Sequence, residues 1–192
     1  MKQAILSAVF IIAVNTSFAT PLRNWSDSSR VSIPEPAEIL SEIVKVTGLQ
    51  SNFELKAADV LNIEASISHK KRYILYNPSF INWINSITKD KWAVMALLAH
   101  EIGHHLNGHT MLKTGSTPEL ELEADQFAGF VLHKLGASLE QAQEVMKHIA
   151  KTEASKTHPG RSSRMAAIQT GWTRASGADE IIAGVNSGAQ PY

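Results

Sequence analysis

The stretch AVMALLAHEIGHHLNGH at residues 93–109 decides the fold of this chain. Residues 93–99 are apolar, so a helix formed by them would be hydrophobic on every side. A helix of this kind is typical of the interior of a domain rather than its surface. We expect it to begin near Thr88 or Asp90 and to end at Asn107-Gly108. The rest of the domain should therefore pack around this helix.

Two histidines and a glutamate follow the apolar run in the pattern H-E-x-x-H. His100 and His104 are four residues apart, so a helix places both on one face, where they can bind one metal ion. Glu101 lies one residue along and can reach a water molecule at the metal without being a ligand. The alternative is a pair of buried, hydrogen-bonded histidines. It would bury two imidazoles and a carboxylate with no ion, which is costly.

A catalytic zinc site needs a third protein ligand and an open fourth position. Asn107 and Thr110 stand where the metzincin pattern requires glycine and histidine, which excludes that class. The next predicted helix, which opens at Thr117-Pro118, offers acidic residues instead. Glu121 is the expected ligand, and Asp125 would accept the second N–H of a ligand histidine. The pair of Glu119 and Glu123 has the same spacing and is the minor alternative.

Three motifs in order resemble those of the CAAX prenyl protease and HtpX-like zinc metallopeptidases. They are AHEIGHHLNGH at 99–109, ELEAD at 121–125 and THPGRSSR at 157–164. The resemblance implies one zinc ion per chain, held by His100, His104 and Glu121. It also implies a zincin-like domain with a β-hairpin at residues 60–77, before the active-site helix. This agrees with the mostly helical α+β class, with one small sheet, that the predicted elements give.

The resemblance further implies which residues carry the chemistry. Glu101 would take a proton from water and return it to the leaving amine. His158 would donate to the oxyanion or approach the metal as an inhibitory ligand, and both roles stay open. Arg164 would anchor its loop through a salt bridge or contact substrate. His105 and His109 are also four residues apart, so a second metal site is an alternative there; we expect them instead to finish the helix, where their N–H groups can reach free carbonyls.

Composition narrows the possible classes of protein. The chain has 192 residues, with 18 basic and 18 acidic side chains, and no cysteine. Charge balance argues against a nucleic-acid partner, because phosphate binding needs a basic excess. The absence of cysteine excludes disulfides, a thiolate zinc site and a lipid-modified N-terminal cysteine.

The ends of the chain suggest export. Residues 1–19 have a signal-peptide pattern with cleavage expected after Ala19, followed by an extended lead-in at 20–34. The peptidase domain is expected at 35–173, and a flexible tail at 174–192. No second apolar run approaches eighteen residues, so we expect a soluble mature chain in the periplasm, or secreted as the alternative.

The expected function is a zinc endopeptidase of the cell envelope that acts on misfolded or unassembled proteins. Its substrates would bind as extended peptides along a strand edge of the hairpin. One alternative is a zinc-bound folding factor or binding module with latent or lost proteolysis. Another is a secreted protease that acts on foreign proteins.

Overall fold

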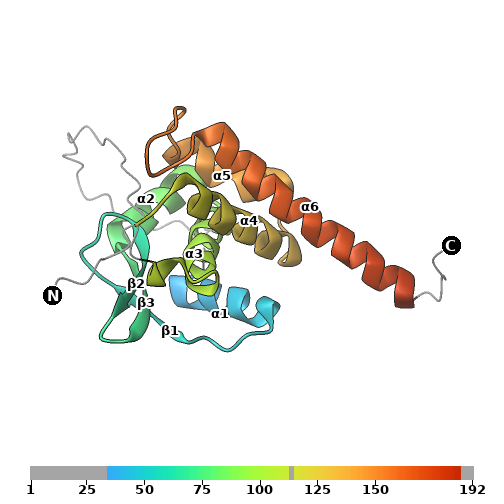
Figure 1. Ribbon diagram of the computed structural model, residues 1–192, viewed down its shortest axis with the longest axis horizontal. Coiled ribbons are helices and arrows are strands. Elements are labelled where there is room, and N and C mark those ends of the chain that lie inside the picture. The colour runs from blue at the N-terminus through green and yellow to red at the C-terminus, as the bar shows by residue number, and fades with distance from the viewer. Residues whose placement is uncertain (1–33, 113–114, 187–192) are drawn as a thin grey trace, which may run out of the picture.

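The computed structural model describes residues 34–112 and 115–186, with side chains through residue 178. The predicted signal peptide and nearly all of the lead-in lie outside the described residues. Figure 1 shows helices packed around α3, with a small sheet at one end. The elements in chain order are α1 (Pro36–Thr47), β1 (Phe53–Ala57), β2 (Ile63–Ser68), β3 (Lys71–Tyr76), α2 (Pro78–Thr88), α3 (Lys91–Leu106), the 3₁₀ turn η1 (His109–Met111), α4 (Pro118–Lys134), α5 (Leu139–Ile149) and α6 (Arg161–Asn186).

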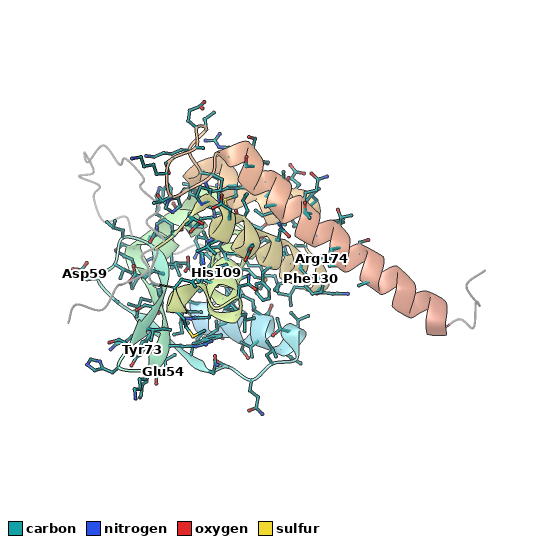
Figure 2. All side chains as sticks on the ribbon, viewed as in Figure 1. Glu54, Asp59, Tyr73, His109, Phe130 and Arg174 are labelled. Atoms are coloured by element: carbon teal, nitrogen blue, oxygen red, sulfur yellow. The ribbon has the colours of Figure 1, made fainter. Side chains whose placement is uncertain are left out.

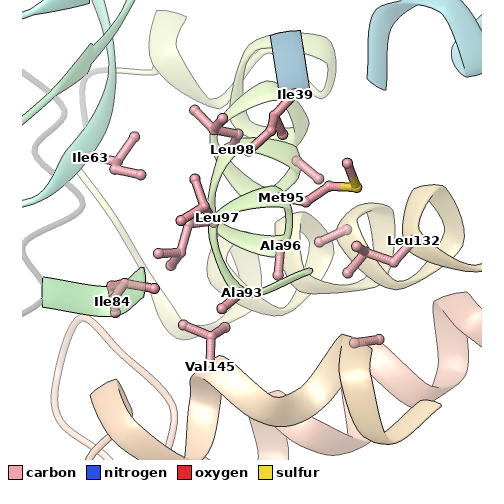
Figure 3. Close-up of a cluster of buried hydrophobic side chains, with 14 of the residues drawn as sticks. Ile39, Ile63, Ile84, Ala93, Met95, Ala96, Leu97, Leu98, Leu132 and Val145 are labelled. Atoms are coloured by element: carbon pink, nitrogen blue, oxygen red, sulfur yellow. The ribbon is translucent and has the colours of Figure 1, made fainter. Parts of the chain in front are cut away.

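Helix α3 is the centre of the domain, as its apolar sequence predicts. Asp90 caps its first turn by accepting a hydrogen bond from the Trp92 N–H at 3.0 Å. Every residue from Ala93 to His105 is buried. Figure 3 shows side chains of neighbouring helices around it, with Ile39 of α1 next to Leu98 and Val145 of α5 next to Ala93. The helix that carries H-E-x-x-H is therefore held on several sides.

The sheet has three strands in the order β1-β3-β2. Strands β2 and β3 form the expected antiparallel hairpin, although β2 begins at Ile63 rather than Val60. His69 and Lys70 join them with φ values of 49° and 65°, as in a two-residue hairpin turn with both central residues left-handed. Strand β1, which the sequence did not predict, pairs parallel to β3. The predicted α+β class, mostly helical with a small sheet, is confirmed.

Helix α6 is much longer than expected. The sequence predicted a helix from Ser162 to Trp172 followed by a tail, but the helix runs from Arg161 to Asn186. The segment contains no proline, and its small residues let it continue along α4. Ala175 is buried, and its carbonyl accepts a hydrogen bond from Lys134 at the end of α4 at 3.3 Å. The predicted helix end at Trp172 is therefore wrong, and residues 187–192 of the predicted tail lie outside the described part.

Two glycines allow α4 and α6 to cross at close range. A Cβ atom on Gly129 of α4 would lie 2.0 Å from the Ile168 carbonyl oxygen of α6. A Cβ atom on Gly171 of α6 would lie 1.8 Å from the Gln126 carbonyl oxygen of α4. Both distances are far inside van der Waals contact, so only glycine fits at either position. This crossing brings the start of α6 to the buried acidic face of α4.

Within the described residues, no helix combines the length and apolar character needed to cross a lipid bilayer.

Candidate metal centre

Three side chains from two helices meet in the interior. His100 and His104 lie one turn apart on α3, and Glu121 lies in the first turn of α4. The Nε2 atoms of the two histidines are 3.1 Å apart. Glu121 places Oε2 3.3 Å from Nε2 of His100 and Oε1 3.5 Å from Nε2 of His104. The sequence-predicted ligands therefore converge, and all three are buried.

The donor atoms fit a tetrahedral zinc ion. Ligands about 2.0–2.2 Å from such an ion lie roughly 3.3–3.5 Å from one another, close to the three distances found here. Two imidazoles and one carboxylate are also a ligand set typical of catalytic zinc, which keeps its fourth position open. In addition, Oε1 of Glu101, beside these ligands, is buried without a hydrogen bond. Buried polar atoms in this state call for an ion or water.

The alternative acidic pair lies away from the cluster. Glu119 is exposed on the first turn of α4. Glu123 has an exposed side chain that points to His109 rather than to the two ligand histidines. Of the four acidic residues in this segment, only Glu121 places its carboxylate among the converging donor atoms.

A buried ion pair holds the outer side of His100. Its Nδ1 lies 2.8 Å from Oδ1 of Asp125. Arg164, from the first turn of α6, donates to both oxygens of that carboxylate at 2.7 Å. Asp125 thus lies where the sequence predicted a partner for a ligand histidine. Arg164 contacts this carboxylate directly, and its side chain is buried.

In the metal-free protein, positively charged side chains face the buried carboxylates of Glu121 and Asp125. Burial favours neutral His100, but Asp125 and Glu121 outweigh it and raise the pKa of His100 to about 10. Burial and the charge of His100 lower the pKa of His104 to about 3. The pKa of Asp125 is lowered despite burial, because Arg164 and His100 favour its charged form. His100 and Arg164 are therefore the cations that face the two carboxylates.

A backbone N–H of the sheet holds the Glu101 carboxylate in place. Its Oε2 accepts a hydrogen bond of 2.7 Å from the backbone N–H of Ala65 in β2. In an antiparallel pair, the backbone groups of alternate residues point toward the partner strand and away from it. The Asn77 N–H donates to the Asn62 carbonyl at 2.7 Å, which fixes this alternation for the hairpin. The backbone groups of Ala65 and Ile67 therefore point away from β3. Burial raises the pKa of Glu101 to about 8. One carboxylate oxygen is thus fixed by the strand edge, and the other has no hydrogen bond.

His158 lies near the cluster but not in it. Its Nδ1 is 2.8 Å from the Thr157 hydroxyl, and its backbone N–H donates to the Ser155 hydroxyl at 3.0 Å. Ser116 connects this loop to the ligands, because its hydroxyl contacts Oε1 of Glu121 and the Thr157 carbonyl. Residues of this loop, His158 among them, line a cavity of about 210 Å³ together with Arg164. The donor atoms of His158 are not among those that converge within 4.8 Å.

The other two histidines of the segment 93–109, His105 and His109, have different contacts. His105 points to the sheet, where Nε2 lies 2.8 Å from the Tyr73 carbonyl and the ring stacks on Phe53. It has the structural role expected, although its partner is a strand and not the helix end. His109 lies beyond the helix in η1, and its two ring nitrogens contact His104 and Glu123. Sequence reasoning missed this arrangement because it placed His109 in the last helical turn.

Comparison with known proteins supports the resemblance at a coarse level. The profile of Peptidase family M48 matches residues 111–171, which is less than half of the chain. This segment includes Glu121, Asp125, His158 and Arg164, but not the H-E-x-x-H pattern. No curated protein matches the chain.

One solved structure is similar to part of the chain. It is the crystal structure of the metallopeptidase zymogen of Pyrococcus abyssi abylysin. The two are 17% identical over 60% of this chain and 91% of that one, with a TM-score of 0.36. A TM-score this low does not establish a shared fold.

Proposed function

We propose that this protein is a zinc-dependent endopeptidase. The observation that carries the proposal is the convergence of His100, His104 and Glu121 beside the buried carboxylate of Glu101. Zinc held by the three ligands would polarise the scissile carbonyl and make a water molecule more acidic. The match to a peptidase family supports the same class of reaction. The CAAX prenyl protease and HtpX-like subtype is part of this proposal.

Glu101 is the proposed general base and acid. The Ala65 N–H fixes one of its oxygens, which leaves the other to take a proton from the attacking water. The same carboxyl group would then deliver that proton to the leaving amine. A raised pKa suits this exchange, because the group can hold the proton between the two steps.

The outward backbone groups of β2 are the proposed peptide site. An extended substrate would add as a strand along this edge, next to the Glu101 carboxylate. His158 would enter from the loop on the other side as the second donor to the oxyanion. The proposed substrates are misfolded or unassembled proteins of the cell envelope, with the periplasm as the compartment. This part rests on the family resemblance and on the signal-peptide pattern.

A latent form of the enzyme is the second candidate. His100, His104 and Glu101 are at most 1% exposed, so substrate cannot reach them in this conformation. The Ser116 hydroxyl contacts both Glu121 and the Thr157 carbonyl, so it joins the segment before α4 to the loop that carries His158. Displacement of these segments would have to precede cleavage. A folding factor with a permanently closed zinc site would keep them in place.

The test compares wild type with Glu101→Gln, measuring bound zinc and cleavage of casein. The matched control is Glu140→Gln, which changes a glutamate with an 84% exposed side chain on α5. We expect all three proteins to bind zinc, and only Glu101→Gln to lose cleavage. Equal turnover by wild type and Glu101→Gln would refute the enzymatic assignment. Zinc binding with no cleavage by any of the three would favour the second candidate, a latent enzyme or a folding factor with a closed zinc site.

A further inference from the structure

The two ligand histidines are supported differently on their outer sides. Nδ1 of His100 contacts the Asp125 carboxylate directly. Nδ1 of His104 lies 3.0 Å from Nδ1 of His109 instead. Nε2 of His109 in turn lies 3.0 Å from Oε2 of Glu123. The outer nitrogen of each ligand histidine is thus linked to a carboxylate. His100 contacts Asp125 directly, whereas His104 is linked to Glu123 through the imidazole of His109.

We propose that His109 and Glu123 are positioning residues that fix the ring of His104 for metal binding. The proposal rests on the zinc site described above, and extends it to two residues outside the ligand set. Neither would touch metal or substrate. They would act through His104, by holding its ring plane and selecting its tautomer.

The direction of each hydrogen bond follows from the chemistry of the groups. Nε2 of His104 faces the other donor atoms, so it must be unprotonated to bind a metal, and the ring proton must lie on Nδ1. That N–H can only donate to His109, whose Nδ1 must then be the acceptor. His109 therefore carries its own proton on Nε2 and donates it to Glu123. An ionised carboxylate only accepts, so Glu123 sets the orientation of the whole chain of contacts.

The backbone around His109 supports this arrangement. Gly108 adopts a left-handed conformation with φ of 77°, which turns the chain sharply after α3. The turn returns His109 to the helix it follows, five residues after His104. The two rings meet edge to face, with centroids 5.1 Å apart and planes at 68°. Figure 2 marks His109 on η1, and its side chain is only 2% exposed.

Asp125 and Glu123, the two carboxylates linked to the ligand histidines, differ in exposure. Asp125 is completely buried and neutralised by Arg164. The Glu123 side chain is 57% exposed, so only its inner oxygen is committed to His109. Exposure makes Glu123 a convenient position for substitution, because its removal leaves the core unchanged. A measured effect of Glu123 on zinc binding would therefore have to pass through His109.

The experiment measures the zinc dissociation constant of the purified protein by competition with a chelator. We expect His109→Ala to raise this constant about 10- to 100-fold, as is typical for partners of metal-bound histidines. His109→Asn should restore most of the affinity, since its Oδ1 can replace Nδ1 as acceptor. Glu123→Ala should raise the constant less than His109→Ala, and Glu123→Gln should stay near wild type because its amide oxygen still accepts.

A matched control removes a similar pair far from the site. His148 and Glu144 form an Nε2–Oε1 contact of 3.1 Å on the surface of α5. His148→Ala should leave zinc affinity unchanged. If His109→Ala does not fold, Glu123→Ala still tests the proposal, because its side chain is exposed.

Spectroscopy separates positioning from general stability. In the zinc-loaded protein, the Nδ1 proton of His104 should give a slowly exchanging NMR signal that His109→Ala abolishes and His109→Asn keeps. Cobalt-loaded protein should show a visible spectrum that changes in His109→Ala and stays the same in His148→Ala. If wild type binds zinc but His109→Ala matches it in affinity and spectrum, the positioning role is refuted and the peptidase proposal stands. If wild type binds no zinc, the peptidase proposal itself fails.

Discussion

Arg164 binds both carboxylate oxygens of Asp125, at 2.7 Å each, although the two residues lie on different helices and 39 positions apart. The pair is buried, since Arg164 is 2% exposed and Asp125 is fully enclosed. Through it, α6 is connected to a proposed zinc ligand, because Asp125 also contacts His100. The Arg164–Asp125 ion pair therefore contributes both to the packing of α6 against α4 and to the position of His100.

Replacing the arginine should be strongly destabilising. Arg164→Met would leave the buried Asp125 carboxylate with His100 as its remaining cationic partner, and breaking a buried ion pair typically costs about 3–5 kcal/mol. The free energy of unfolding of metal-free protein in urea measures this loss. Arg174→Met, an exposed position on the same helix, is the control and should change stability little. A loss for Arg164→Met no greater than for the control would mean that the pair contributes nothing to the fold.

The helix crossing gives a second prediction. Gly171→Ala would place a methyl group 1.8 Å from a backbone oxygen of α4, so the two helices must separate. We expect a loss of at least about 1–3 kcal/mol in the free energy of unfolding, as for other overpacked cores. Gly177→Ala is the matched control on the same helix, because its Cβ would meet nothing within 4 Å. There, alanine should stabilise by roughly 0.5–1 kcal/mol.

Comparing the two substitutions tests the packing directly. Opposite signs would confirm that the crossing distance, and not helix propensity, decides the outcome at Gly171. Equal stabilisation in both variants would contradict the close approach of α4 and α6.

Much of the fold follows from local sequence patterns. The apolar run at 93–99 predicts a helix buried on every side, and Asn77-Pro78 predicts the start of α2, because each signal depends on neighbouring residues alone. Strand β1 was missed because its five residues gain their order from a parallel partner beginning 18 positions later at Lys71. The true length of α6 was missed for a similar reason, since packing against α4 supports a segment rich in small residues.

The candidate site was also predictable only in part. Helical spacing alone brings His100 and His104 together, and Glu121 follows from an acidic helix plus the family resemblance. The partners of His109 were not predictable, because the left-handed turn at Gly108 returns the chain to α3. Neither was the bond from Ala65 to Glu101, which depends on how the sheet docks against the helix.

The choice of third ligand gives a third prediction. Glu121→Ala should abolish stoichiometric zinc binding, because it removes the only carboxylate among the converging donor atoms of the described residues. Glu119→Ala, two residues away and exposed, is the control and should retain the full zinc content. Metal analysis after dialysis against a weak chelator measures both. Zinc lost from Glu119→Ala and kept in Glu121→Ala would overturn the ligand assignment.

The charge state of His100 gives the last prediction. With its pKa raised to about 10, chiefly by Asp125 acting against burial, His100 is protonated in metal-free protein at pH 7. A metal ligand must be neutral, so zinc binding has to release that proton. Because protons compete with zinc below pH 10, affinity should rise with pH, by about tenfold per unit for one proton, and level off near the pKa.

Calorimetric titration in buffers of different ionisation enthalpy counts the released protons. Glu101→Gln is the protein to use, because Glu101 has a pKa of about 8 and would otherwise contribute to the count. We expect about one proton per zinc at pH 7. Asp125→Asn in the same background removes the main charge that keeps His100 protonated, so the number should fall toward zero. A count near zero before that substitution would show that His100 is neutral in the metal-free protein, and that burial outweighs its two carboxylate neighbours.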